Sequence, residues 1–374
     1  MRGELVEDVA KLESARSQWD ELAIAAGRPY ALSGWMLPWW RNASPEGARL
    51  RTVLVYDGDD LIGVAPLYEP VPGGRWLRFL ASGTSTSVEP VARSGREREV
   101  ADALARVLAE STEVPIAVAF EGVPHDSPWP DLLRESWPGG KRPAVDDERR
   151  TAAPLLDIAG RDHVAWIASQ SSKYRKAMRR RRRRLDDVGG RGPILVEPAD
   201  LANALGAFVE LHHARWNSRG GTGALSPGVE RMVEELPRTL APEHLRVWVI
   251  EAGGRIVAAE ILLAAGGTVS SWLGGFDDAF ADCEPSILCL DEAVRDAFVR
   301  GERCVDFGPG AQGFKRRWAE SEQLLRWAHV IPAGRGAVRT RGVVRAKRLR
   351  RFAAERIPDR QKTLLKRVLR RGDR

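Results

Sequence analysis

A short stretch late in the chain, residues 304–318, has the residue types of a binding site. An apolar run ends at Asp306, a glycine-rich turn follows, and Lys315 and Trp318 come next. Glycines let a backbone approach a ligand closely, and a lysine just beyond them can meet an anion. Asp306 can accept a hydrogen bond from an incoming ammonium group or simply cap the turn. Lys315 can neutralise a phosphate or a carboxylate, or be an ordinary surface lysine.

A single carboxylate interrupts the apolar run Ile256–Ala265 at Glu260. A buried carboxylate must be paired, protonated or functional, and burial raises its pKa. Glu260 is therefore a candidate base for a protonated amine. The alternative is an outward-facing glutamate at a strand edge.

Three further side chains are weaker candidates for substrate binding. His212 lies in a helical pattern, where a histidine is more often structural than functional. Trp216 and Trp318 can wall an acceptor pocket or pack in a core, because indole rings carry a large burial area. The three cysteines have no metal-ligand spacing and fit reduced thiols, so we expect no metal site.

Alternating helices and strands must position these residues in the second half. Asp162 and Ser171 or Ser172 can cap two helices, and apolar periodicity predicts the rest. The expected helices are 163–170, 172–187, 200–217, 228–240, 286–300 and 312–319, and the expected strands are 194–197, 245–251, 256–264, 268–276, 304–307 and 324–331.

The first half has a similar mixture, which includes a hairpin with strands 52–56 and 61–68. The remaining elements are expected at 12–26, 96–109 and 131–137 as helices and at 76–80 and 115–120 as strands, with an aromatic segment at 35–40. The polar residues 138–153 are the best linker candidate. The segments 55–67 and 249–261 resemble each other faintly, since each has a strand, a turn and a second strand, and this suggests two related domains. We therefore predict an α/β fold with mixed sheets: domains at 1–150 and 160–335, and a basic helical tail at 336–374 that is split near Pro358.

The net charge of +7 is concentrated in two places, the arginine-rich helix 173–184 and the tail 335–374. Basic blocks suggest contact with phosphates, either of tRNA or of anionic lipid. A solvated arginine-rich face is the alternative. The N-terminus lacks the apolar region of a signal peptide, and no apolar run approaches the ~20 residues of a membrane span. We expect a cytoplasmic protein, or one at the periphery of a membrane.

The order of elements in the second half resembles that of the GNAT acyltransferase superfamily. The resemblance extends to its bacterial tandem-domain branch, the CelD-type cellulose-biosynthesis-like proteins, and distantly to the Fem aminoacyl transferases. It covers residues 15–335. The segments that carry it are Asp306-Phe-Gly-Pro-Gly310, Phe314-Lys-Arg-Arg-Trp318, Leu211-His-His-Ala-Arg-Trp216 with Gly220, Tyr174–Leu185, Trp35–Trp40 and Gly63-Val-Ala-Pro-Leu67.

The resemblance implies transfer of an acyl group from acyl-CoA, acetyl-CoA in particular, to a small amine or amino sugar. The donor would lie where strands 268–276 and 304–307 part. Its binding residues would be Leu273, Gly274, Gly275, Ser286, Ile287 and Lys315, with Ser286 also the N-cap of its helix. The catalytic residues would be Glu260 and Asp306. The acceptor would be bound by His212, Trp216 and Trp318.

Two features depart from the superfamily pattern. The donor loop, residues 277–286, carries four carboxylates and no cation, and Phe314 stands where a tyrosine is common. An aminoacyl-tRNA-dependent transferase of the Fem kind is therefore the alternative enzyme. A non-catalytic GNAT-fold scaffold in envelope or polysaccharide synthesis is the third reading.

Overall fold

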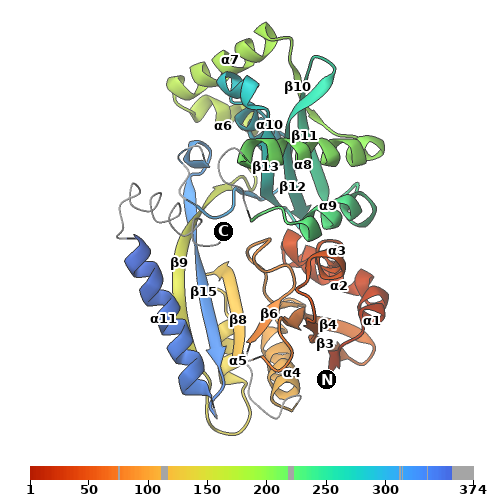
Figure 1. Ribbon diagram of the computed structural model, residues 1–374, viewed down its shortest axis with the longest axis vertical. Helices are drawn as coiled ribbons and strands as arrows, with labels where there is room; N and C mark the ends of the chain where they lie inside the picture. The colour runs from red at the N-terminus through yellow and green to blue at the C-terminus, as the bar shows by residue number, and fades with distance from the viewer. Residues whose placement is uncertain are drawn as a thin grey trace, which may run out of the picture.

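The computed structural model describes residues 1–74, 76–110, 117–217, 223–310, 313, 315–334 and 336–355, which form two β-sheets with helices around them (Figure 1). Among these residues the smaller sheet has the order β1-β3-β4-β7. The larger has the order β10-β11-β12-β13-β14-β9-β15-β8-β6-β5-β2. The larger sheet mixes parallel and antiparallel pairs, which confirms the predicted α/β class with mixed sheets.

The strands are β1 (Arg2–Val6), β2 (Arg49–Leu50), β3 (Thr52–Asp57), β4 (Asp60–Ala65), β5 (Leu67–Glu69), β6 (Trp76–Phe79), β7 (Val91–Ala92), β8 (Ala117–Pro124), β9 (Ala144–Asp157), β10 (Arg191–Leu195), β11 (Leu245–Ala252), β12 (Arg255–Ala265), β13 (Thr268–Phe276), β14 (Cys304–Asp306) and β15 (Ser321–Ile331). The helices and 3-10 turns are α1 (Val9–Ser14), α2 (Arg16–Ala25), η1 (Pro29–Ala31), α3 (Ser33–Ala43), α4 (Glu97–Glu110), α5 (Trp129–Glu135), α6 (His163–Ser169), α7 (Ser172–Asp187), η2 (Pro198–Asp200), α8 (Leu201–Asn217), α9 (Pro227–Thr239), η3 (Asp278–Cys283), α10 (Pro285–Val299), η4 (Lys315–Arg317) and α11 (Ala337–Glu355).

Most predicted elements are present, and their local signals explain them. The side chain of Asp162 caps α6, and the side chain of Ser171 caps α7. The predicted hairpin is the β3–β4 pair, and β11 and β12 form the matching hairpin in the second half. The helix predicted over 12–26 is divided into α1 and α2 at Ala15. Pro358, where we expected the tail to be split, lies outside the described residues.

The polar stretch 138–153 is not the predicted linker, because most of it belongs to strand β9. Its charged side chains find partners on the neighbouring strand β15. Glu148 lies 3.1 Å from the His329 Nε2 atom, and the Arg149 guanidinium lies 3.5 Å from the centre of the Trp327 ring. A buried polar side chain is stable when it is paired. Because its residues are polar, this segment was wrongly predicted to be a linker although it forms a strand.

Strands β9 and β15 join the two halves of the chain into one sheet. Strand β9 pairs with β14 from the second half and along its length with β15. Strand β15, which we expected to end the second domain, also pairs with β8 from the first half (Figure 1). The predicted division at residues 150–160 thus falls within continuous sheet.

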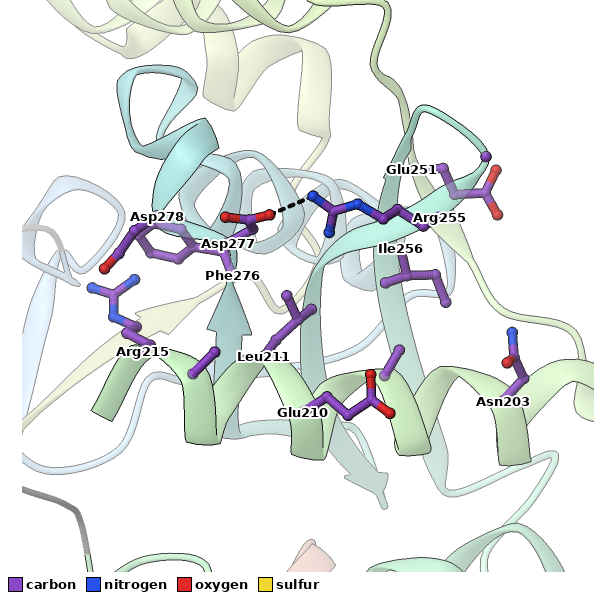
Figure 2. Close-up of a pocket in the computed structure, with 13 residues that line it drawn as sticks. Asn203, Glu210, Leu211, Arg215, Glu251, Arg255, Ile256, Phe276, Asp277 and Asp278 are labelled. Atoms are coloured by element: carbon purple, nitrogen blue, oxygen red, sulfur yellow. Dashed lines mark hydrogen bonds and ion pairs between the residues drawn. The ribbon is translucent and has the colours of Figure 1, made fainter. Parts of the chain in front are cut away.

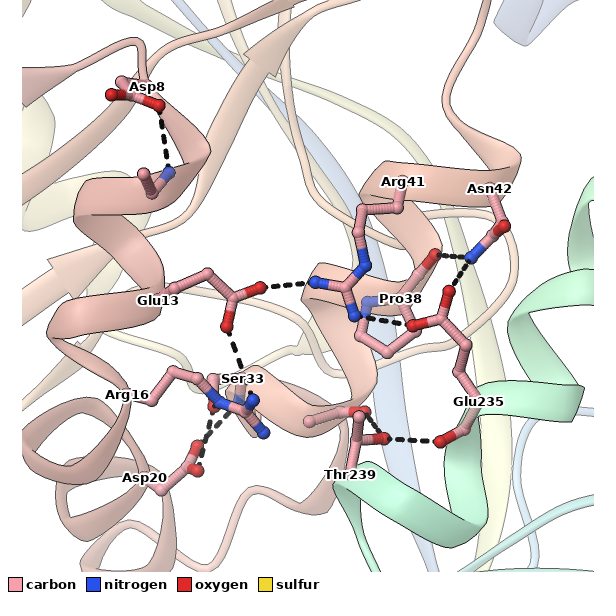
Figure 3. Close-up of polar contacts among 12 residues, drawn as sticks. Asp8, Glu13, Arg16, Asp20, Ser33, Pro38, Arg41, Asn42, Glu235 and Thr239 are labelled. Atoms are coloured by element: carbon pink, nitrogen blue, oxygen red, sulfur yellow. Dashed lines mark hydrogen bonds and ion pairs between the residues drawn. The ribbon is translucent and has the colours of Figure 1, made fainter.

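A helix contact also fixes the first half against the second (Figure 3). Arg41 and Asn42, at the end of α3, bind the two carboxylate oxygens of Glu235 on α9, each at 2.6 Å. The Thr239 hydroxyl donates to the Gly34 carbonyl at 2.7 Å. A Cβ atom at Gly34 would lie 2.3 Å from the Thr239 carbonyl oxygen, so glycine is required for this approach.

The second-half strands β11 and β12 are buried on both faces. Helix α8 packs against β12 and β13 on one face, and α10 packs on the other. Ile261 and Leu263 belong to the core shared with the first half, whereas Leu262 and Ala264 pack with α10. Because side chains alternate along a strand, Glu260 lies on the α10 face. A near-continuous apolar run such as β12 is typical of a strand buried on both sides.

Candidate active site

The parallel strands β13 and β14 part after three residue pairs. Their register ends at Ser270 opposite Asp306. Beyond that pair β13 continues to Phe276, while the chain after β14 follows β9, where the Phe307 amide donates to the Pro154 carbonyl. Strand β13 also has a bulge at Trp272, between Leu273 and Ser271 in its pairing with β12. The predicted fork is confirmed, and the far part of β13 has no strand partner on that side among the described residues.

A cavity of about 750 Å³ lies at this fork and is lined by both halves of the chain. Seven of the residues predicted for the site line it: Trp216, Glu260, Leu273, Gly274, Ser286, Ile287 and Lys315. Gly275, His212, Asp306 and Trp318 do not. Tyr30 and the loop 83–86 come from the first half, which therefore supplies one wall.

Glu260 is the acidic centre of the cavity and is only 5 % exposed. It faces Gly274 across the β12–β13 pair, and a Cβ atom at that glycine would lie 2.0 Å from a carboxylate oxygen. Burial raises the pKa of Glu260 to about 7, while the Ser286 hydroxyl, Arg215 and Lys315 act to lower it. The carboxyl group can therefore exchange a proton near neutral pH.

Ser286 acts differently from the predicted N-cap. Helix α10 begins at Pro285, and its N-cap is Glu284, whose φ is 48°. Proline suits the first helical position because its missing N–H has no partner there anyway. Ser286 is consequently inside the first turn, and its hydroxyl hydrogen-bonds to Glu260.

Lys315 and Asp306 hold the glycine-rich turn between them. The Lys315 ammonium donates to the carbonyls of Gly308 (3.3 Å) and Pro309 (3.1 Å), and burial lowers its pKa. The Asp306 carboxylate accepts from the Gly308 amide at 2.8 Å, and burial raises its pKa. Asp306 lines a separate cavity of about 110 Å³. It therefore does not share a cavity with Glu260. Phe314 lies outside the described residues.

The predicted acceptor residues have different locations. Trp216 lines the cavity, and the buried His212 ring packs behind it at 6.2 Å between ring centres. Neither His212 nitrogen has a hydrogen bond of ordinary geometry to a described residue, and burial lowers its pKa. Gly275 admits α8 closely, because a Cβ atom there would lie 3.0 Å from the His212 amide nitrogen. Gly220, part of the quoted motif, lies outside the described residues.

Trp318 is a core residue and does not wall the cavity. Its ring stacks on Phe307 with 5.5 Å between centres, and its Nε1 atom donates to Asp291 at 3.2 Å. The Tyr174 hydroxyl donates to the same carboxylate oxygen. Both side chains thus pack between α7, α10 and the turn after β14.

Sequence reasoning missed the aromatic residues of the first half. The Tyr30 hydroxyl donates to the Ser271 carbonyl at 3.2 Å, directly at the fork. Trp272, at the bulge, donates to the Thr84 carbonyl at 2.8 Å and packs edge-on against Trp35 at 5.0 Å. The high tryptophan content was the available signal, but it did not show which rings would meet.

The acidic donor loop is neutralised by arginines. The Glu284 carboxylate lies 2.5 Å from Arg181 and 3.8 Å from Arg317. Asp277 lies 2.5 Å from Arg255. Arg181 comes from the arginine run of α7 and is buried. Part of the arginine run therefore pairs with the acidic donor loop.

A second, more open groove of about 590 Å³ runs along α8 at the end of β13 (Figure 2). The Arg215 guanidinium lies 3.7 Å from the centre of the Phe276 ring. Both residues line the groove and the larger cavity, so this pair forms the border between them.

The described residues contain neither a metal-binding cluster nor a helix that could span a membrane. No group of three or more histidine, cysteine, aspartate or glutamate side chains could hold a metal ion there. In the same part of the chain, none of the helices is both long and apolar enough to cross a bilayer.

Comparison with known proteins identifies the fold. Residues 172–316 match the family model of an acetyltransferase (GNAT) domain. The crystal structure of FemX matches with a TM-score of 0.58 and 12% identity, over 88% of this chain and 97% of that one. A C-terminal domain (DUF2156) from Agrobacterium fabrum, of a protein named as a lysylphosphatidylglycerol synthetase, matches with a TM-score of 0.54 and 10% identity, over 88% and 95%.

A conserved protein of unknown function from Bacteroides thetaiotaomicron gives a TM-score of 0.53 at 12% identity, over 85% of this chain and 96% of that one. No curated protein matched. At these identities the structural matches speak for the fold alone. The chain has the acetyltransferase fold of the GNAT superfamily, and the part that matches the GNAT domain model lies in its second half.

Proposed function

We propose that the protein is an N-acyltransferase of the CelD-type tandem GNAT branch, which transfers an acyl group from acyl-CoA to an amine by direct attack. The observation that carries this proposal is a buried glutamate with a pKa of about 7 inside one cavity, beside the part of β13 that has no partner strand on its β14 side among the described residues. Proton acceptance and carbonyl polarisation are the two needs of amine acylation.

The residues of the fork fit a thioester donor. Backbone from Leu273 to Gly275 offers an extended edge for the pantetheine arm. The first turn of α10 offers the Ser286 N–H group and a favourable dipole for phosphate. The Ile287 N–H group already donates to the Glu284 carbonyl at 3.0 Å. Lys315 adds a cation. The carboxylates of the loop oppose phosphate binding less than their number suggests, because Glu284 and Asp277 are paired with arginines.

In the proposed reaction Glu260 accepts a proton from the acceptor ammonium, directly or through a water. The neutral amine attacks the thioester carbonyl carbon, so that an N–C bond forms while the C–S bond breaks. Backbone N–H groups of β13 stabilise the oxygen that becomes negative. The coenzyme A thiolate leaves, the amide nitrogen loses its extra proton, and the thiolate takes up a proton through solvent. Asp306 supports the geometry by holding the turn that carries Lys315. The acceptor would be a small amine or amino sugar that contacts Trp216.

Calorimetry and a transfer assay test this function separately. The wild-type protein should bind acetyl-CoA or a longer acyl-CoA, and Glu260→Gln should bind it comparably but transfer ~10²–10⁴-fold more slowly. Lys315→Met should weaken donor binding. Failure to bind any of these thioesters at millimolar concentration would refute the proposal and leave the aminoacyl-tRNA-dependent transferase and the non-catalytic scaffold.

A second donor class, aminoacyl-tRNA, is favoured by one observation on α7. Lys173, Lys176, Arg180 and Arg183 are exposed and make no ion pair within the described residues. Their spacing places them on one face of the helix, over ~15 Å. This basic face fits a phosphate backbone.

Filter binding with tRNA at several salt concentrations tests the second class. A basic face that contacts tRNA should lose affinity steeply as salt rises. Reversal of charge in Lys176→Glu and Arg180→Glu should reduce both the affinity and its salt dependence. Binding that is absent, or unchanged by salt, would exclude aminoacyl-tRNA as the donor.

A further inference from the structure

The inner face of helix α11 is fixed to the large sheet (Figure 1). Val344 is buried in a small cluster with Ala117 and Ile331, and Thr340 is buried beside it. The Arg341 Nε atom donates to Asp146 on β9 at 3.1 Å. The helix is thus held on the sheet by one side, and its outward side can be identified.

The outward side of α11 carries apolar side chains where a surface helix normally carries polar ones. Val338 is 86 % exposed and Leu349 is 68 % exposed. With Gly342 and Ala346 they follow the spacing i, i+4, i+8, i+11, which places all four on one line along a helix. At 100° per residue this line lies opposite Thr340 and Val344.

Cations flank the apolar line on both sides. Arg339 lies on one side of it, and Arg345 and Arg348 lie on the other, all of them exposed. Lys347 turns towards the sheet, where its Nζ atom lies 5.7 Å from the centre of the Trp76 ring. The sequence of α11 contains seven lysine and arginine residues and a single acid, Glu355 at its end. An exposed line of apolar side chains with cations on both sides fits a partner whose outer layer is negatively charged and whose interior is apolar.

We propose that α11 is an interfacial anchor that lies on an anionic lipid bilayer. Val338 and Leu349 enter the boundary between headgroups and acyl chains, and the flanking cations contact lipid phosphates. A nucleic acid would satisfy the cations but would give no role to the outward valine and leucine. This inference is independent of the proposed chemistry, since α11 does not line the cavity at the fork.

Vesicle flotation of the full-length protein tests the anchor. Wild-type protein should float with phosphatidylcholine vesicles that contain about 30% phosphatidylglycerol, and should not float with pure phosphatidylcholine. The double variant Val338→Gln/Leu349→Gln should partition about tenfold less. Arg345→Gln/Arg348→Gln should lose about fivefold for each cation. A matched control, Val164→Gln/Val299→Gln, removes two equally exposed valines elsewhere and should float like the wild type.

Three outcomes would overturn the anchor. The first is no association of the wild type with anionic vesicles. The second is association that the Val338→Gln/Leu349→Gln variant leaves unchanged, because cations alone would then explain it. The third is RNA binding tighter than vesicle binding, with the apolar variant equal to the wild type, which would assign the helix to nucleic acid. All substituted positions are exposed, so melting temperatures should stay within about 1 °C of wild type.

Discussion

Replacing Glu260 by glutamine should stabilise the folded protein, and more so as pH rises. Below about pH 4.5, the ordinary pKa of a glutamate, the carboxyl group is protonated in both the folded and the unfolded chain. Between that value and about 7, the folded protein holds a proton that the unfolded chain has lost. The free energy of unfolding therefore falls as pH rises through this window, and above it the loss is complete.

The size of the effect follows from the two pKa values. Their difference lowers the free energy of unfolding of the wild type by about 3 kcal/mol above pH 7, and by about half of that near pH 5.5. Unfolding entropy is about 2 cal/mol/K per residue, or about 0.8 kcal/mol/K for this 374-residue chain. Glu260→Gln should thus melt about 4 °C above the wild type near pH 8.5, but only about 2 °C above it near pH 5.5. The glutamine oxygen can still accept the hydrogen bond from the Ser286 hydroxyl.

Scanning calorimetry of both proteins at these two pH values measures the difference. Glu234→Gln, at an exposed position on α9, is the matched control and should melt like the wild type at both. A melting difference that does not change with pH would refute the reasoning, because it would mean that Glu260 is not a buried acid with a raised pKa. A lower melting temperature for Glu260→Gln near pH 8.5 would refute it as well.

Three further outcomes follow from the same geometry. If Glu260 is the base, kcat/KM for acyl transfer should rise with pH to a plateau, with an apparent pKa near 7, since the ionised form is the active one; a flat profile between about pH 5.5 and 8.5 would contradict this. Gly274→Ala should displace the Glu260 carboxylate, lower the free energy of unfolding by about 1–3 kcal/mol and abolish transfer. Gly206→Ala is the control, because its added methyl group meets nothing within 4 Å. It should be neutral or slightly stabilising in urea unfolding. Glu235→Ala removes the partner of Arg41 and Asn42 between α3 and α9, and should lower stability by about 1 kcal/mol without changing KM for the donor; an unchanged urea midpoint would show that this contact does not hold the halves together.

Local signals in the sequence were sufficient for much of the fold. Hydrophobic periodicity and turn residues predicted the hairpins and most helices, and the capping side chains of Asp162 and Ser171 marked two helix starts correctly. These features depend on neighbours a few residues apart, so a linear pattern records them. Glu260 was found for the same reason, because a lone carboxylate within an apolar run is visible in the linear sequence, although its burial was decided by the packing of α10.

Contacts between distant segments were decided only by the tertiary structure. Strand β9 was hidden because the partners of its charged side chains lie almost two hundred residues away, on β15. The start of α10, by contrast, was a local feature that sequence reasoning missed, because Pro285 takes the first helical position and places Glu284 at the N-cap.

The site itself is the clearest case of this division. The sequence determined that a carboxylate, a lysine and a glycine-rich turn would lie in the second half. It did not determine that Tyr30 would close the fork from the first half, or that Arg181 would neutralise the donor loop. Pairing between remote side chains depends on the packing angle of whole helices and sheets, and no local pattern encodes that angle.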